Sequence, residues 1–210
     1  GYSNKTSYDN QILPLRDTSS SILKPAIVEY RVDGKRNEKN KVNKTEAETI
    51  VSLIEACLDM EEYKNSTFGV ISLLGDEQAE LIQNLIVKRI SAVDIEKHKI
   101  LCVNSASFQG DERDIIILSM VRNPKGRHNR EFIDQFERIN VALSRARCML
   151  IIVGAQDFLS KTSIDLPDIN GHKELDSKSF PIYKEIIKTI QMKGRILQAE
   201  DIIGEEKNAK

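Results

Sequence analysis

Short apolar runs alternate with segments of helical periodicity along most of this chain. Residues 68–74, 114–121 and 149–153 are continuous apolar runs with the length of a strand that is buried on both faces. Weaker strand patterns lie at residues 26–32 and 99–103. Because apolar residues at three- and four-residue spacing occupy several of the intervals, helices are expected to cover the strands. The sequence therefore predicts an α/β fold, with a parallel sheet flanked by helices.

Helix boundaries can be placed from the capping residues. The first helix begins near Asn43 or Thr45, either of which can cap it, and has acidic residues in its first turn, where they favour the helix dipole. Asp76 is expected to cap a second helix. Two further helices are expected over residues 131–144 and 182–192, the latter opened by a proline.

The chain divides into three parts by composition. Residues 1–24 form a polar lead-in, residues 25–160 form the α/β domain, and residues 161–210 are expected to form a polar loop with a C-terminal helical extension. The polar opening without Met suggests a piece of a longer protein. A total of 210 residues can bury a sizeable core.

Charge and cysteine content exclude several classes of protein. Lys and Arg number 31 against 32 Asp and Glu, so any contact with a polyanion must be local. No apolar run approaches the length of a membrane span and no signal peptide opens the chain, which favours a cytoplasmic protein without a membrane partner. The three cysteines are widely spaced in apolar segments, so we expect buried free thiols of a reducing compartment.

Two segments place polar residues where an apolar strand or helix ends. Residues 104–114 read N-S-A-S-F-Q-G-D-E-R-D, and residues 137–147 read E-R-I-N-V-A-L-S-R-A-R. The ends of strands and helices are where a parallel sheet presents groups to a phosphorylated ligand. Of these groups, a guanidinium such as Arg145 is permanently charged and can donate two hydrogen bonds to phosphate oxygens. The two segments therefore predict a site for such a ligand.

Together the two segments resemble motifs V and VI of superfamily 1 helicases. The resemblance is closest to the branch of the nonsense-mediated-decay RNA helicase, where the motifs read roughly T-V-D-S-F-Q-G-x-E-x-D and R-x-N-V-A-L-T/S-R-A-R. It implies a RecA-like second motor domain, similar to P-loop NTPases but without its own Walker A, since no G-x-x-x-x-G-K-S/T occurs in the chain. The first RecA-like domain of the same parent protein would then hold most of the ATP and its magnesium. This chain alone is not expected to hydrolyse ATP.

The resemblance assigns roles on the nucleotide side residue by residue. Arg145 matches the arginine finger and is the predicted catalytic residue, while Arg147 is expected to support it or to contact nucleic acid. Glu112 matches the position of the family's ribose-contacting glutamate. A carboxylate beside phosphates would be repelled unless it accepted hydrogen bonds from hydroxyls or paired with an arginine, so a contact with the sugar or with Arg145 is expected. Gly110 allows a tight turn, and Gln109 offers a donor and an acceptor; both are expected to line the nucleotide.

Contacts to single-stranded DNA or RNA are expected from other residues of the same region. Asn104 and Ser107 can hydrogen-bond a phosphate without reading sequence. This chain has Asn104 and Ala106 where the family usually has Thr and Asp. The difference is expected to weaken the contact with single-stranded nucleic acid and to leave the residues that contact the nucleotide unchanged. Arg122 is the first residue of a basic loop, residues 122–130. This loop could contact the bound single strand of nucleic acid or the nucleotide, or it could be an ordinary solvated loop.

Other interpretations of the sequence stay open. Gln78 partly matches a glutamine of motif IV, whereas the acidic pair that opens the second helix could instead be a Walker B. A glycine separates the acidic pair from the preceding strand, which disfavours a Walker B. The leading reading is an ATP-dependent DNA or RNA helicase domain; the rivals are a helicase-like binding or regulatory module without motor activity and a flavodoxin-type binding domain. His98 and His172 have no ligand spacing and are expected at the surface.

Overall fold

A parallel sheet forms the centre of the computed structural model. The structure describes residues 23, 27–32, 36–37, 39–74, 76–104, 106–108, 110–121 and 144–154, and the backbone of 164–165, 179–180 and 195–198. Six strands pair in the order β3-β2-β4-β5-β1-β8, and every pair is parallel. They are β1 (Ile27–Arg31), β2 (Phe68–Ser72), β3 (Leu101–Asn104), β4 (Arg113–Ser119), β5 (Ala146–Gly154) and β8 (Arg195–Gln198). The predicted α/β class and parallel sheet are confirmed.

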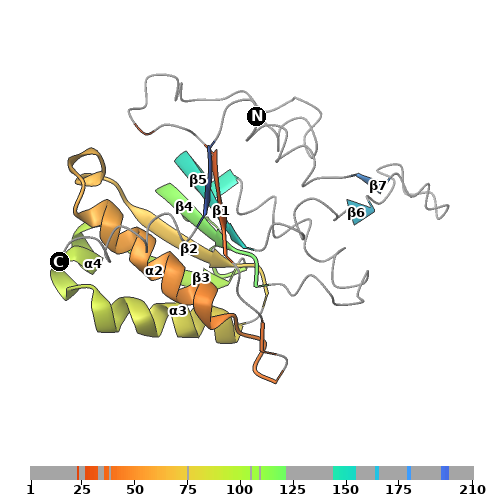
Figure 1. Ribbon diagram of the computed structural model, residues 1–210. Coiled ribbons are helices and arrows are strands. Elements are labelled where there is room, and N and C mark those ends of the chain that lie inside the picture. Colours follow the sequence, from red (N-terminus) through yellow and green to blue (C-terminus); the bar gives the residue numbers. More distant parts are fainter. Residues whose placement is uncertain are drawn as a thin grey trace.

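Two helices pack side by side on one face of this sheet (Figure 1). They are α2 (Lys44–Leu58) and α3 (Asp76–Arg89); the short η1 (Glu61–Tyr63) and α4 (Ala92–Lys97) follow them in turn. Asn43 caps α2, since its side chain accepts from the backbone N of Glu46 at 3.1 Å. Asp76, the predicted cap of the second helix, is instead the first residue of α3, so the helix begins one residue earlier than predicted.

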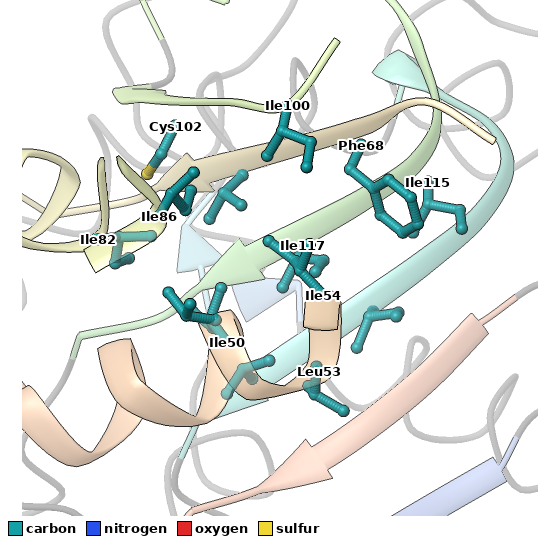
Figure 2. Close-up of a cluster of buried hydrophobic side chains, with 14 of the residues drawn as sticks. Ile50, Leu53, Ile54, Phe68, Ile82, Ile86, Ile100, Cys102, Ile115 and Ile117 are labelled. Atoms are coloured by element: carbon teal, nitrogen blue, oxygen red, sulfur yellow. The ribbon is translucent and has the colours of Figure 1, made fainter. Parts of the chain in front are cut away.

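The core between the helices and the sheet is built from alternate strand residues. Ile50 and Ile54 of α2 and Ile82 and Ile86 of α3 are fully buried against strand residues (Figure 2). Those strand residues include Phe68, Val70, Cys102, Ile115 and Ile117. Each residue of β2 is buried, so the strand is covered on both faces, as its continuous apolar run predicts. Burial raises the pKa of the free Cys57 thiol to about 12 and that of Cys102 further still.

The chain crosses the opposite face of the sheet between β3 and β4. These strands flank β2 in the sheet, so the connection must pass over β2. Phe108 makes this passage, fully buried on top of Gly69. A Cβ at Gly69 would lie 2.4 Å from Phe108 Cζ and 2.8 Å from Ile116 Cδ1, so the crossing requires glycine there. Gly110 then turns the chain with a φ of 88°, as expected of a glycine in a tight turn.

Several predicted features differ from the structure or lie outside the described residues. The polar segment near residue 170 is flanked by a two-stranded antiparallel pair, β6 (Ile164–Asp165) and β7 (Ser179–Phe180), and β8 adds a strand beside β1. None of these three strands was predicted, because they are short and lack alternation. Residues 1–22, the predicted helix at 182–192, the C-terminal end and all but the last residue of the helix at 131–144 lie outside the described residues. No described helix is both long and apolar enough to cross a membrane.

His98 corrects a prediction, because it is buried and not at the surface. Its Nδ1 lies 2.8 Å from the carbonyl oxygen of Ser66, and its ring packs at 6.0 Å from that of Phe68. Through these two contacts the imidazole, which directly follows α4, stabilises the start of β2. Periodicity missed this because His98 sits in a turn, where no apolar stripe marks the buried side. His172 lies outside the described residues.

Candidate functional site

Polar groups of the two motifs lie at two opposite edges of the sheet. Glu112 immediately precedes β4, and Arg145 and Arg147 lie at the start of β5. Because the strands are parallel, these three residues share the amino-terminal edge. Asn104, in contrast, ends β3 at the carboxy-terminal edge, and the crossing at Phe108 joins the two. The motif at 104–114 therefore runs from one edge of the sheet to the other.

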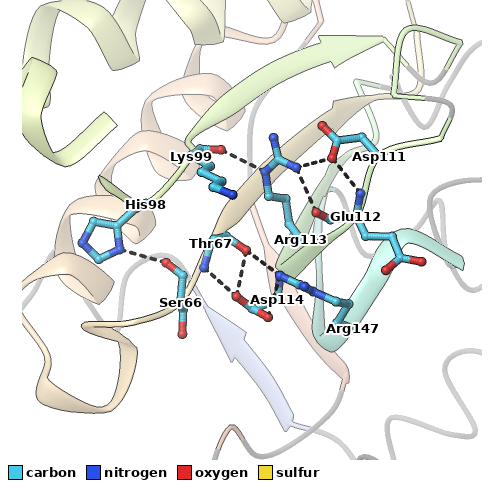
Figure 3. A network of polar contacts seen from close by, with 9 residues as sticks. All are labelled: Ser66, Thr67, His98, Lys99, Asp111, Glu112, Arg113, Asp114 and Arg147. Carbon is cyan, nitrogen blue, oxygen red and sulfur yellow. Dashed lines mark hydrogen bonds and ion pairs between the residues drawn. The ribbon is translucent and has the colours of Figure 1, made fainter. Parts of the chain in front are cut away.

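Arg147 is held by side chains from two neighbouring strand starts. Its Nη2 lies 3.0 Å from Asp114 Oδ1 and donates to Thr67 Oγ1 at 3.2 Å (Figure 3). Thr67 precedes β2, and Asp114 belongs to β4. The guanidinium is about one third exposed. Arg147 is thus anchored within its own sheet, in line with a supporting role.

Arg145, two residues earlier, has no such anchor. Its Nε, like that of Arg147, is buried without a hydrogen-bond partner, and no hydrogen bond or ion pair joins any other atom of Arg145 to another described residue. A buried guanidinium donor without an acceptor is unfavourable by about 1–3 kcal/mol, and more for a charged group. The position suits an acceptor supplied from outside the described residues, and a phosphate oxygen fits this chemistry.

The turn that carries Glu112 is fixed by Arg113, a residue that the motif reading did not single out. Arg113 is 9% exposed, and its Nε donates to the carbonyl oxygen of Lys99 at 2.9 Å. Its Nη1 donates to the carbonyl oxygen of Glu112 at 2.8 Å and pairs with Asp111 (Figure 3). The guanidinium also lies 5.7 Å from the centre of the Phe108 ring. The hydrogen bond from Arg113 lowers the pKa of Asp111.

Glu112 itself is exposed, and no described residue bonds its carboxylate. Figure 3 shows its side chain on the same side of the turn as Arg147. The fixed backbone and the free carboxylate together present one acceptor group at the amino-terminal edge. Such a group can accept from hydroxyls or pair with a cation.

A hollow of about 570 Å³ lies at the other edge, between α3 and β3. Asn104 Nδ2 donates to Asp76 Oδ1 at 2.6 Å, and the backbone N of Ser107 donates to Asn104 Oδ1 at 2.8 Å. The carboxylates of Asp76 and Glu80 line the same hollow. These carboxylates would repel a phosphate, so the geometry weighs against a phosphate deep in the hollow. Contact of Asn104 and Ser107 with nucleic acid stays a prediction.

Next to the hollow, a buried polar cluster closes the end of β4. Glu46 Oε1 accepts from Ser119 Oγ at 2.5 Å and from the backbone N of Val121 at 3.0 Å. Gln78, fully buried, donates to Ser119 Oγ at 3.3 Å and accepts from the backbone N of Asn43 at 2.8 Å. Burial raises the pKa of Glu46 to about 7, although the hydrogen bonds from Ser119 and Val121 lower it. Gln78, the motif IV candidate, is thus structural in this chain.

Val121 shows how firmly this cluster holds the chain. Its φ of 54° lies in the left-handed region, where a β-branched residue is strained. The hydrogen bond to Glu46 helps to fix this conformation at the point where the basic segment begins. Sequence reasoning placed Glu46 only in the first turn of α2 and could not see its partners.

Some predicted site residues cannot be placed. Gln109, Arg122 and the rest of the basic loop at 122–130 lie outside the described residues. Within the part of the chain that the structure describes, no group of three or more His, Cys, Asp or Glu side chains could hold a metal ion. The carboxylate of Asp76 is engaged with Asn104, which weighs against a Walker B at this position.

The parallel sheet with its flanking helices defines a RecA-like α/β domain. A scan against protein families matches residues 4–157 to the family described as AAA domain. Helicase sen1 of Schizosaccharomyces pombe is 32% identical over 73% of this chain, and the 5'-3' DNA helicase ZGRF1 of Mus musculus is 31% identical over 67%. The regulator of nonsense transcripts 1 homolog of Arabidopsis thaliana is 35% identical over 57%. The chain spans 10%, 7% and 9% of these relatives, respectively.

This chain therefore belongs to the AAA domain family. It is a superfamily 1 helicase domain, related to the branch of the nonsense-mediated-decay helicase.

Proposed function

We propose that this chain is the second RecA-like domain of an ATP-dependent superfamily 1 helicase and that Arg145 is its arginine finger. The observation that supports this role most strongly is the difference between the two arginines. The Nη2 of Arg147 is engaged by Asp114 and Thr67, whereas no hydrogen bond or ion pair joins Arg145 to a described residue; the Nε of each arginine is buried without a partner. Of the two arginines, Arg145 is the one without a bond to a described residue, and a ligand would supply its acceptor.

The nucleotide would meet this chain at the amino-terminal edge of the sheet. Bound ATP with its magnesium would supply the phosphoryl group, held mainly by a first RecA-like domain, since this sequence contains no Walker A. Arg145 would donate to the terminal phosphate and offset the negative charge that develops during transfer. Glu112 would accept from the ribose hydroxyls, on a turn whose backbone Arg113 fixes.

Movement along nucleic acid would follow from closure of the two domains. Closure on ATP brings Arg145 into place, and opening after hydrolysis shifts the domains along a single strand of DNA or RNA. The carboxy-terminal edge, with Asn104, Ser107 and the basic segment that begins at Arg122, is the part of this chain proposed to face that strand. Backbone contacts of this kind weaken as salt rises.

The test is ATP turnover by the full-length protein that contains this chain. Arg145→Ala should lower kcat by at least about a thousandfold, as loss of an arginine finger does. Arg89→Ala is the matched control, because the partners of Arg89 among the described residues are Glu55 and Ser52 on the helical face. Unchanged turnover in Arg145→Ala would refute the assignment. An inactive wild-type protein that still binds single strands would favour a binding or regulatory module.

A further inference from the structure

Thr67 lies outside every motif, yet it joins two of them. It precedes Asp114 by 47 residues and Arg147 by 80. Its backbone N and its Oγ1 donate to Asp114 Oδ2 at 2.9 Å and 2.7 Å, and its Oγ1 accepts from the backbone N of Asp114 at 3.0 Å. Since a hydroxyl has one donor and two acceptor sites, the bond from Arg147 completes its capacity. We call Thr67, Asp114 and Arg147 the strand-start clamp.

The clamp sits where the regular ladder between β4 and β5 is interrupted. Arg113 pairs with Ala146, but Ile115 pairs with Met149, so Arg147 and Cys148 together oppose Asp114. This is a β-bulge, which disrupts the ladder locally and re-aims the side chains beside it. Backbone hydrogen bonds therefore cannot by themselves fix the start of β5. The side-chain bonds of the clamp supply that constraint.

The position of Arg145 depends on this constraint because Arg145 is only two residues before Arg147 in the chain. Its Cα can lie at most about 7 Å from that of Arg147, so a shift at the bulge is passed almost undiminished to Arg145. Arg145 has no bond of its own to a described residue that would hold it in place. A displacement of about 1 Å at a catalytic group can lower a rate by about a hundredfold.

We infer that Thr67 and Asp114 are positioning residues for phosphoryl transfer: they hold Arg147 at the bulge and thereby set the place of Arg145. This inference rests on the proposed function of Arg145. It adds a residue that no motif contains and gives the second arginine a definite task. The clamp bears on the catalytic step and not on the binding of ATP, because neither Thr67 nor Asp114 is itself assigned a contact to the nucleotide.

The experiment measures kcat and the KM for ATP in the full-length protein, with oligo(dT) or oligo(rU) at saturation. Thr67→Val keeps the shape and removes the hydroxyl; it should lower kcat at least about tenfold and change the KM less than about twofold. Thr67→Ser restores the hydroxyl and should recover most of the turnover. Thr49→Val is the matched control, because the Thr49 hydroxyl donates to the carbonyl oxygen of Thr45 within α2 and to no other residue in the described ranges. It should behave as wild type.

Asp114→Asn provides a second variant that keeps the size of the side chain. It removes the charge that pairs with Arg147 and should also lower kcat with little change in KM. Wild-type kcat in both Thr67→Val and Asp114→Asn would overturn the inference, as would a loss confined to the KM. Arg145→Ala in the same assay separates the two proposals. If Arg145→Ala loses turnover while the clamp variants keep it, only the positioning role of the clamp is wrong. If Arg145→Ala keeps turnover, the proposed function is wrong.

Discussion

The buried carboxyl of Glu46 should make the stability of this domain depend on pH. Its side chain is 1% exposed at the end of β4, and burial raises its pKa from 4.5 to about 7. Below pH 4.5 the group is protonated in both folded and unfolded chains. Between the two values folding takes up a proton, and above pH 7 the buried charge must be tolerated. The stability contributed by the protonated group is therefore lost as pH rises through 7.

The size of this effect follows from the two pKa values. At about 1.4 kcal/mol for each pH unit between them, the contribution of Glu46 falls by about 2–3 kcal/mol from pH 5 to pH 8. Other groups also titrate over this range, so the quantity to measure is the difference between wild type and Glu46→Gln. Glutamine keeps an oxygen that can accept from Ser119 and from the backbone N of Val121. It does not titrate.

Urea unfolding at pH 5, 6, 7 and 8 gives the required free energies. The free energy of unfolding of wild type, relative to Glu46→Gln, should fall by about 2–3 kcal/mol across the series. Glu48→Gln is the control, because Glu48 is exposed on the same helix and its ion pair within the described part of the chain is with Lys44. Its profile should run parallel to wild type. A Glu46→Gln profile that also runs parallel, or that diverges in the opposite direction, would refute the reasoning.

Two further stability predictions concern the connection between β3 and β4. Gly69→Ala should destabilise the domain by about 3 kcal/mol, because the new Cβ meets the Phe108 ring. Gly110→Ala has open space and should cost only about 1–2 kcal/mol for its left-handed backbone, so an equal or larger loss in Gly110→Ala on urea unfolding would contradict this. Arg113→Met should cost about 1–3 kcal/mol, since it leaves the carbonyl oxygens of Lys99 and Glu112 without their part-buried donor. Arg89→Met, at an exposed ion pair, should cost under about 1 kcal/mol, and thermal or urea unfolding that ranks the two arginines in reverse would contradict the burial argument.

Local patterns in the sequence were enough to predict most of the sheet and both long helices. The apolar runs became β2, β4 and β5 because a strand covered on both faces needs no polar alternation. Asn43 was one of the two predicted caps and is the one used, since the cap depends on residues only three positions away. These features are encoded within a few residues of where they act.

The long-range polar partners could not be predicted from the same patterns. Glu46 bonds Ser119, 73 residues away, and Thr67 bonds Asp114 and Arg147, which periodicity does not link. The division of the motif between two edges likewise depends on the strand order, because β2 separates β3 from β4. A sequence motif indicates which residues belong to the functional site. The topology decides which of them face the same ligand.

The central claim is that the guanidinium of Arg145 acts on the phosphate during ATP hydrolysis. Chemical rescue tests it most directly, because free guanidinium ion can enter the space left by the side chain and supply the same donors and charge. In the full-length protein, millimolar guanidinium should restore a measurable part of the turnover lost in Arg145→Ala, while the same salt should not restore Glu112→Ala. Sodium chloride at equal ionic strength should restore neither variant. Turnover in Arg145→Ala that stays at wild-type level without guanidinium, or that is lost and does not respond to it, would contradict the account.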